Sequence, residues 1–313
     1  MLSRRLIRIK AFKTLFAYEA SHADNPAAAQ KTLLESCDKV KDLYYFMLNI
    51  SASLIRVAED KIAVGLQKFR PTEEEAHPNL KFVHNRFAAL LSDDPEFGRY
   101  CQKRGLLWGE YEPFVKHVFN SLTTKEYYQN YMQSGEDSLE EDCRLFSCIF
   151  EDEFEDNEEL ASILEDLSVL WVDDLAFALN AIIAGIDETA HKHHIVHPNT
   201  FLKEDDKDFA LRLLGESIAR YDEYFDLLSE HLDNWKSDRL VSTDAALIVM
   251  GITEAVVFPT IPVKVTINEY VEISKYYSTP NSRVFVNGIL DRIIQEKVRE
   301  GEVVKQGRGL YEQ

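Results

Sequence analysis

Apolar side chains recur three or four positions apart along most of the chain, which is the period of an amphipathic helix. In the first such stretch, residues 3–22, the apolar stripe includes Ile7, Ala11 and Leu15, and Ser3 stands where an N-cap belongs. The 313 residues contain 12 Gly and 9 Pro, which is few turn formers for this length. Pattern and composition together therefore predict an all-α protein.

The same period predicts helices through the middle of the chain. A long amphipathic pattern covers about 31–70, and Pro71 and Pro78 bracket the loop after it. Shorter helical patterns follow at about 79–92, 95–106, 110–121, 123–133, 138–149, 158–167 and 170–189.

The last third begins with a predicted helix over about 205–233. Ser242 or Thr243 is the expected cap of the next helix, whose mostly apolar body, Ala245 to Val257, has to be buried on nearly all sides. Pro262 stands where the first residue of a further helix belongs.

The last strong helix is predicted to start at a second cap, Ser282. Gly288 lies inside it and costs about 1 kcal/mol against Ala, so we expect a close contact with another helix there. Residues 300–313 are expected to form a frayed tail.

Two segments in this last third carry a specific motif. Residues 262–275 read Pro-Val-Lys-Val-Thr-Ile-Asn-Glu-Tyr-Val-Glu-Ile-Ser-Lys, and after a short turn residues 285–291 read Phe-Val-Asn-Gly-Ile-Leu-Asp. They resemble the C-terminal signature of the NusB family, P-x-K-V-x-I-N-E-x-[VI]-E-[LI]-[AS]-K followed by [KR]-F-V-N-G-[VI]-L-[DN]. Val284 departs from it, because the family prefers Lys or Arg before the Phe.

Upstream segments resemble other parts of the same family. Residues 244–254 resemble its apolar helix, and residues 209–232 resemble the helix before that. Residues 4–16 resemble its arginine-rich first helix, a match that is weak when taken alone. The resemblance thus implies a NusB-like core formed by residues 1–22 and 206–313, interrupted by a helical insertion at 23–205.

The resemblance implies both fold and function. The expected fold is a pair of antiparallel helical bundles with the inserted helical region between their parts. The expected activity is that of a transcription antitermination factor, which binds single-stranded boxA-type RNA together with the ribosomal small-subunit protein NusE in an antitermination complex on RNA polymerase. It implies no catalysis and no cofactor.

Single-stranded RNA is bound by cations that meet phosphates and by flat side chains that stack on bases. Three arginines cluster in the opening turns of the first helix, where cations oppose the helix dipole, which suggests that they serve binding. In the family, the turn that enters the last helix belongs to the RNA surface; Phe285 there fits core packing equally well. The predicted RNA-binding residues are Arg4, Arg5, Arg8, Lys10, Asn281, Arg283 and Phe285.

The net charge of −19 argues against nucleic acid until its distribution is considered. Residues 1–22 carry +4 and residues 206–313 carry −5, so that residues 23–205 carry −18. The acidic insertion either competes with RNA, masking the arginines until a partner displaces it, or binds a basic protein. The alternative function is therefore a non-enzymatic interaction scaffold that has lost RNA binding.

Several other classes of protein find little support. The basic N-terminus lacks an uninterrupted apolar stretch, and no run approaches the roughly 20 apolar residues that span a bilayer, so we expect a cytoplasmic protein without a membrane segment. Four scattered cysteines indicate free thiols. Phosphate loops and nucleophile elbows are absent. A metal-dependent enzyme at Asp187, His191 and His194 is the third alternative; we predict no enzyme and no metal site.

Overall fold

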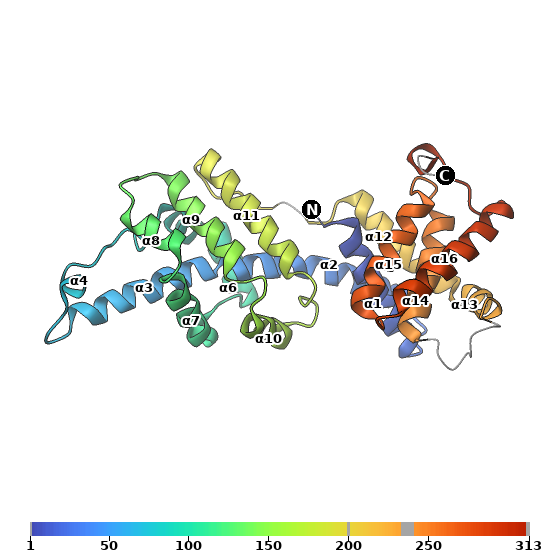
Figure 1. The fold of residues 1–313 in the computed structure, drawn as a ribbon, viewed down its shortest axis with the longest axis horizontal. Helices are drawn as coiled ribbons and strands as arrows, with labels where there is room; N and C mark the ends of the chain where they lie inside the picture. The colour runs from blue at the N-terminus through green and yellow to red at the C-terminus, as the bar shows by residue number, and fades with distance from the viewer. Residues whose placement is uncertain (1, 199–200, 233–240, 311–313) are drawn as a thin grey trace. The chain divides into compact units, whose positions relative to one another are not determined.

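The computed structural model describes residues 2–198, 201–232 and 241–310. Within these ranges the chain forms helices and connecting turns without strands, so the all-α prediction is confirmed (Figure 1). It divides into two compact units: a terminal unit, Met1–Cys37 with Leu202–Gln313, and a middle unit, Asp38–Phe201. This division by contacts differs from the predicted limits of the insertion, 23–205, which rest on family resemblance and stay a prediction.

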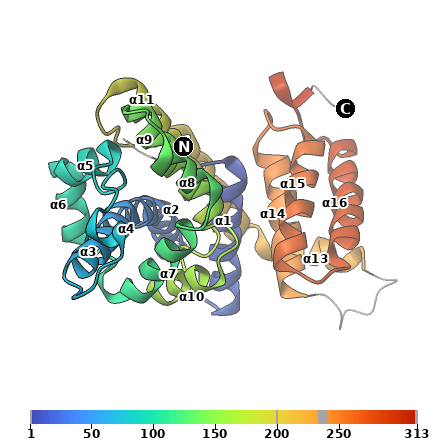
Figure 2. The same cartoon turned by 60° about the vertical axis from the view of Figure 1, so that its left-hand side comes forward.

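The terminal unit is organised around one buried helix, α14. Its helices are α1 (Arg4–Ala20), the first part of α2 (Pro26–Leu48), α12 (Glu204–Ala219), α13 (Tyr221–Glu230), α14 (Ser242–Val257), α15 (Val263–Tyr277), α16 (Ser282–Arg299) and the 3₁₀ helix η3 (Gly307–Leu310). Every residue of α14 from Asp244 to Ala255 is buried, because α1, α12, α13, α15 and α16 all pack against it. Figure 2 shows α13, α15 and α16 beside it. The prediction of a helix buried on nearly all sides is confirmed.

The middle unit is a second helical assembly with an aromatic core. Its helices are the rest of α2, α3 (Ile50–Leu66), α4 (Glu73–Ala76), α5 (Arg86–Asp93), α6 (Pro95–Arg104), η1 (Gly109–Tyr111), α7 (Glu112–Leu122), α8 (Glu126–Gln133), α9 (Leu139–Asp152), α10 (Glu158–Leu167) and α11 (Leu175–Lys192). The Phe46 ring stacks on Trp108 at 4.2 Å and on Trp171 at 5.6 Å between centroids. These contacts join α2 to two later connecting segments of the unit.

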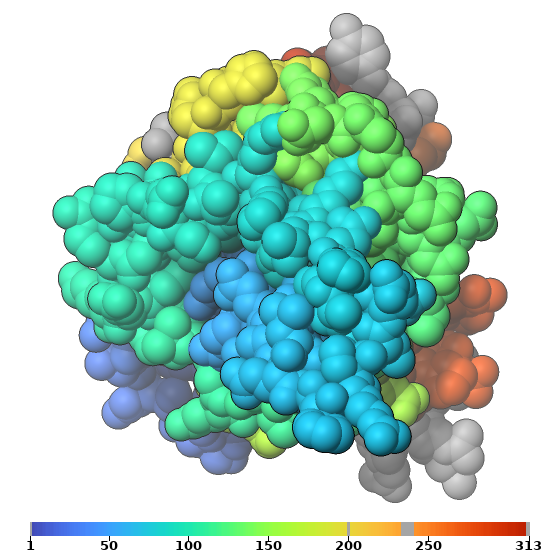
Figure 3. All heavy atoms as spheres, turned by 90° about the vertical axis from the view of Figure 1, so that its left-hand side faces the viewer, coloured from blue at the N-terminus to red at the C-terminus, as the bar shows by residue number. Residues whose placement is uncertain are grey.

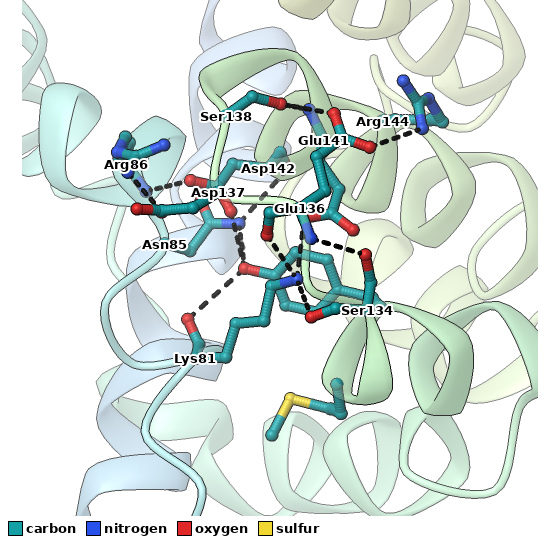
Figure 4. Close-up of polar contacts among 12 residues, drawn as sticks. Lys81, Asn85, Arg86, Ser134, Glu136, Asp137, Ser138, Glu141, Asp142 and Arg144 are labelled. Atoms are coloured by element: carbon teal, nitrogen blue, oxygen red, sulfur yellow. Dashed lines mark hydrogen bonds and ion pairs between the residues drawn. The ribbon is translucent and has the colours of Figure 1, made fainter.

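One polar network holds the loop between α8 and α9 (Figure 4). The Lys81 ammonium donates to the Ser134 and Glu136 carbonyls at 3.1 and 3.0 Å and to the Glu141 carboxylate at 2.7 Å. Nearby, the Tyr131 hydroxyl donates to Asp142 Oδ1 at 2.6 Å. Because these groups are largely buried, their mutual hydrogen bonds offset the cost of removing them from water.

Helix starts and breaks depart from the sequence pattern at several places. Ser3 caps α1 as predicted, its hydroxyl accepting from the Leu6 amide at 3.1 Å. The continuous patterns predicted over 31–70 and 205–233 are each two helices, separated at Asn49 and at Arg220; residue 233 lies outside the described residues. Periodicity did not show these breaks, since the apolar stripe continues across both.

The hydroxyls predicted to cap α14 and α16 make tertiary contacts instead, so those predictions are wrong. Val241 precedes α14, and Asn281 precedes α16, without a side-chain cap bond at either helix. Thr243 lies 3.1 Å from the Ser278 hydroxyl, and the Ser282 hydroxyl donates to Asp244 at 2.7 Å. For Ser282 the tertiary partner is a charged carboxylate, and a hydrogen bond to it is stronger than one to a backbone amide at the helix start.

Residues 300–310 pack on the terminal unit, contrary to the predicted frayed tail; residues 311–313 lie outside the described ones. The Gln306 amide donates to the Pro259 carbonyl at 2.9 Å. The buried Lys305 ammonium donates to the Ala255 and Phe258 carbonyls at 2.7 and 3.1 Å. Lysine there satisfies carbonyls at the end of α14 that have no partner within the helix.

The environment of Lys305 predicts a pH dependence of stability. Burial lowers the pKa of its ammonium from 10.5 to about 8. Between pH 8 and 10.5 the unfolded chain therefore binds more protons than the folded one, so this group's contribution to the free energy of unfolding rises with pH, by at most about 1.4 kcal/mol per unit. Urea denaturation of the wild type and of Lys305→Met at pH 7, 8, 9 and 10 measures it. Parallel curves for the two proteins would contradict the prediction.

The close helix contact lies at Gly251 in α14 and not at Gly288, so the expectation for Gly288 is wrong. A Cβ added at Gly251 would lie 2.7 Å from a Leu290 methyl group, whereas nothing lies within 4 Å of one added at Gly288. Gly288 lies on the exposed side of α16, and the sequence pattern did not show this.

The two glycines form a matched pair for mutation. Gly288→Ala is expected to raise the free energy of unfolding by about 0.4–1 kcal/mol, because alanine restricts the unfolded chain and favours helix. Gly251→Ala is expected to lower it by about 1–3 kcal/mol, because the fully buried Leu290 has little room to move. Urea unfolding measures both; a stabilised Gly251→Ala would show that α14 and α16 adjust freely.

Candidate nucleic-acid interface

The arginines of α1 divide into two exposed side chains and one buried side chain. Arg4 and Arg5, in the first turn, expose 43% and 50% of their side chains, whereas Arg8, one turn later, exposes 4%. Arg4 and Arg8 share a helix face and both lie over the Phe209 ring, at 4.3 and 5.3 Å from its centroid. Only the first turn therefore presents guanidinium groups to solvent in this region.

Acids of the same unit pair with the two exposed arginines. Arg4 Nε lies 2.8 Å from Asp206 Oδ1. Arg5 donates to both oxygens of Glu269, each at 2.9 Å, and this hydrogen bonding raises the pKa of Arg5. Because the partners belong to the terminal unit, neutralising these cations does not require the acidic middle of the chain.

Arg8 forms a buried ion pair with Glu254 of α14. Its Nε and Nη2 donate to the two carboxylate oxygens at 2.6 and 2.8 Å. The Thr266 hydroxyl donates to the same carboxylate at 2.8 Å and the Tyr270 hydroxyl at 3.2 Å. Burial lowers the pKa of Arg8, but the hydrogen bonds and charge of Glu254 outweigh it and raise that pKa overall. The guanidinium is thus committed to packing and is shielded from a phosphate.

Two lysines of α1 also lie in packed surroundings. Lys10 is buried, and its carbonyl accepts from the Thr14 hydroxyl at 2.8 Å. Lys13 Nζ lies 5.2 Å from the centre of the Tyr277 ring of α15. The structure therefore does not place the Lys10 side chain beside Arg4 and Arg5 on the exposed surface.

The turn between α15 and α16 is held by a carboxylate of α14. Ser278 and Ser282 donate their hydroxyls to the two oxygens of Asp244, at 2.6 and 2.7 Å. Sequence reasoning missed this role for Asp244, which looked like an ordinary acid in a first helical turn. The three buried or half-buried groups fix where α16 begins.

The predicted residues at this turn are exposed or partly exposed. Asn281 and Arg283 are exposed, and so is Val284, at the position where the family prefers a cation. Phe285 is half-buried, between the two roles that its sequence position allowed. The start of α16 thus offers one cation and one amide to a ligand.

Helices α1 and α16 both lie against α15. Arg5 pairs with Glu269 of α15, and α16 packs along α15. A hydrogen bond from Lys275 lowers the pKa of Glu272 on α15, and the positive charges of Arg5 and Arg283 lower it further. The first turn of α1 and α16, far apart in sequence, are thus neighbours of the same helix.

Tyr276 is a further candidate that sequence reasoning missed. Its side chain is 80% exposed in the last turn of α15, beside the turn to α16. It lies off the apolar stripe of Ile267, Tyr270 and Ser274, and that offset is the signal that distinguishes it from the half-buried Tyr277. An exposed flat ring is the kind of side chain on which a base can stack.

The structure gives no support to a metal centre. Across residues 2–198, 201–232 and 241–310 no group of three His, Cys, Asp or Glu side chains is placed to hold a metal ion. Helix α11 ends at Lys192, and His194 Nδ1 lies 2.9 Å from the Lys192 carbonyl. In the same part of the chain, no helix is long and apolar enough to cross a membrane.

The terminal unit is an all-α assembly that exposes two cations, Arg4 and Arg5, at the start of α1. The family model described as NusB family matches residues 173–295, a range that begins in α11 and ends in α16. Three relatives named transcription antitermination protein NusB are also similar to this chain. That of Salinibacter ruber is 39% identical over 104 residues, 33% of this chain and 65% of the relative.

The relative from Chloroherpeton thalassium is 38% identical over 106 residues, 34% of this chain and 50% of its own length. The relative from Methylacidiphilum infernorum is 36% identical over 99 residues, 32% of this chain and 69% of its own length. The chain belongs to the NusB family. It spans 65% and 50% of the first two relatives, and no solved structure matches it.

The buried ion pair predicts a large effect on stability. Arg8→Ala leaves Glu254 buried without its counter-charge and is expected to lower the free energy of unfolding by about 3–5 kcal/mol. Replacing both partners, Arg8→Met with Glu254→Leu, is expected to restore part of that loss, because no uncompensated charge remains. Urea denaturation measures both. Arg299→Ala, at the exposed end of α16, is the control; an equally small effect of Arg8→Ala would contradict the buried pair.

Proposed function

We propose that this protein is a non-enzymatic transcription antitermination factor that acts in the cytoplasm. It binds single-stranded boxA-type RNA together with NusE, as part of the antitermination complex on RNA polymerase. Membership of the NusB family and the names of its relatives support the proposal.

The observation that carries the RNA part of this proposal is the pair of exposed guanidinium groups at the start of α1, with the exposed Arg283 on α16, which packs against the same helix α15. They contact phosphates, while Tyr276 stacks on a base and Asn281 reads a base edge. The sequence predicted that Arg8 binds RNA, but its guanidinium is buried. In this proposal Arg8 holds α1 in position, and Arg4 and Arg5 contact the phosphates.

RNA competes with acids of the protein for these cations. A phosphate that binds Arg4 or Arg5 replaces Asp206 or Glu269, so part of the electrostatic gain is offset by the ion pair that is lost. Half-exposed pairs of this kind are weak, and a polyanion that offers several phosphates at once outcompetes them. Binding is therefore expected to weaken steeply as the salt concentration rises.

The double variant Arg4→Ala, Arg5→Ala tests the proposal. It is expected to weaken binding of a fluorescent boxA-like RNA and to reduce the slope of log affinity against log salt by about 1.4, since each contact to single-stranded RNA contributes roughly 0.7. Titrations with and without NusE measure both quantities, and NusE is expected to strengthen wild-type binding.

Two further variants serve as controls. Arg299→Ala removes one positive charge elsewhere on the terminal unit and should leave the affinity nearly unchanged. Glu269→Gln removes the acid that competes for Arg5 and should tighten binding at low salt. Negligible binding by every variant and by the wild type would favour the alternative, a NusB-family scaffold that has lost RNA binding.

A further inference from the structure

One stretch of the middle unit combines strong negative charge with exposed aliphatic side chains. Residues 145–191 contain 13 Asp and Glu and no Lys or Arg. Side chains from elsewhere reach some of these acids: Lys125 Nζ lies 2.5 Å from Asp152 Oδ2, and His117 Nδ1 lies 3.2 Å from Glu159 Oε2. Glu165 and Asp166, at the end of α10, are exposed.

The last residue of α10 and the loop after it present three aliphatic side chains to solvent. Leu167, Val169 and Val172 expose 41%, 70% and 53% of their surface within six consecutive residues. Exposed single apolar residues are common, but three within six consecutive residues offer an apolar partner more than one side chain to cover. We name Leu167, Val169, Val172, Glu165 and Asp166 the α10 face.

Trp171 anchors the loop that carries this face. Trp171 is buried, its indole N–H donates to the Lys39 carbonyl at 2.9 Å, and its ring lies against Phe46. The Trp171 amide donates to the Ser168 carbonyl at 2.9 Å, closing a turn. Because the loop is held in one conformation, binding does not have to order it first, which favours affinity.

We propose that the α10 face docks a basic, amphipathic helical segment of another protein. Such a segment covers Leu167, Val169 and Val172 with its apolar side while its Lys and Arg side chains meet Glu165, Asp166 and neighbouring acids. This inference does not rest on RNA binding, since it concerns other residues in the other unit.

The negative charge of the middle unit favours a basic partner over other classes of partner. The middle unit, residues 38–201, carries 31 Asp and Glu against 15 Lys and Arg, so a second copy of the chain, a nucleic acid and an anionic membrane are all repelled. A polycation without apolar side chains would leave the three aliphatic residues in water. The partner therefore needs both chemistries on one surface.

The end of α3 supplies a matched control on the same unit (Figure 3). There Val64, Leu66 and Phe69 are also exposed, but Phe69 stands between Lys68 and Arg70. Lys68 is paired with Glu75, but a basic segment still gains less beside Lys68 and Arg70 than beside Glu165 and Asp166, so changes at Phe69 should leave the docking unaffected.

The test uses the full-length protein and a fluorescent synthetic helix of Lys and Leu in amphipathic order. We expect salt-sensitive binding, seen as a rise in anisotropy, weakened about tenfold by Val169→Ser with Val172→Ser and unchanged by Phe69→Ser. A peptide of the same composition in scrambled order should bind at least about tenfold more weakly, and a Glu/Leu helix should not bind.

A second variant keeps the test independent of folding at the valines. Glu165→Gln with Asp166→Asn preserves side-chain shape, and circular dichroism confirms the fold of each protein used. Loss of affinity and of salt sensitivity in this variant supports the proposal. Equal binding of the ordered and scrambled peptides, equal losses at Phe69, or no binding by the wild type overturns it.

Discussion

The buried pair of Arg8 and Glu254 is the interaction on which the terminal unit depends. Removing both charges from water costs several kcal/mol, and that cost is offset only because the two groups meet in a bidentate geometry with two further hydroxyl donors. The donors come from α1 and α15 and the acceptor from α14. One carboxylate thus joins three helices through four hydrogen bonds.

Fixing Arg8 also fixes the rotation of α1, and with it which cations reach solvent. With Arg8 turned inward, Arg4 and Arg5 lie at the helix start beside Asp206 and Glu269, and the same packing places the start of α16 near α15. Stability and the proposed recognition of RNA therefore fall to different members of a single arginine cluster. Because Arg8 is buried, the guanidinium groups that α1 exposes are those of Arg4 and Arg5.

The sequence predicted the helices well because their periodicity is strong, and the motif at 262–291 indicated the family that the comparisons confirm. It could not separate Arg8 from Arg4 and Arg5, since burial of an arginine depends on Glu254, 246 residues away in the chain. Ser282 had the local context of a cap, and only the fold shows that Asp244 binds it instead. Tertiary partners decided the features that local patterns left ambiguous.

The order in which the chain is synthesised gives the two units different histories. The middle unit is one continuous segment, Asp38–Phe201, and all of its contacts are available once that segment has left the ribosome. Helix α1 emerges before the middle unit yet waits for Glu254, so its apolar stripe lacks its partner in α14 throughout synthesis of the middle unit. Over that interval α1 is exposed to chaperones that hold nascent chains, and the terminal unit closes only after the middle unit has been made.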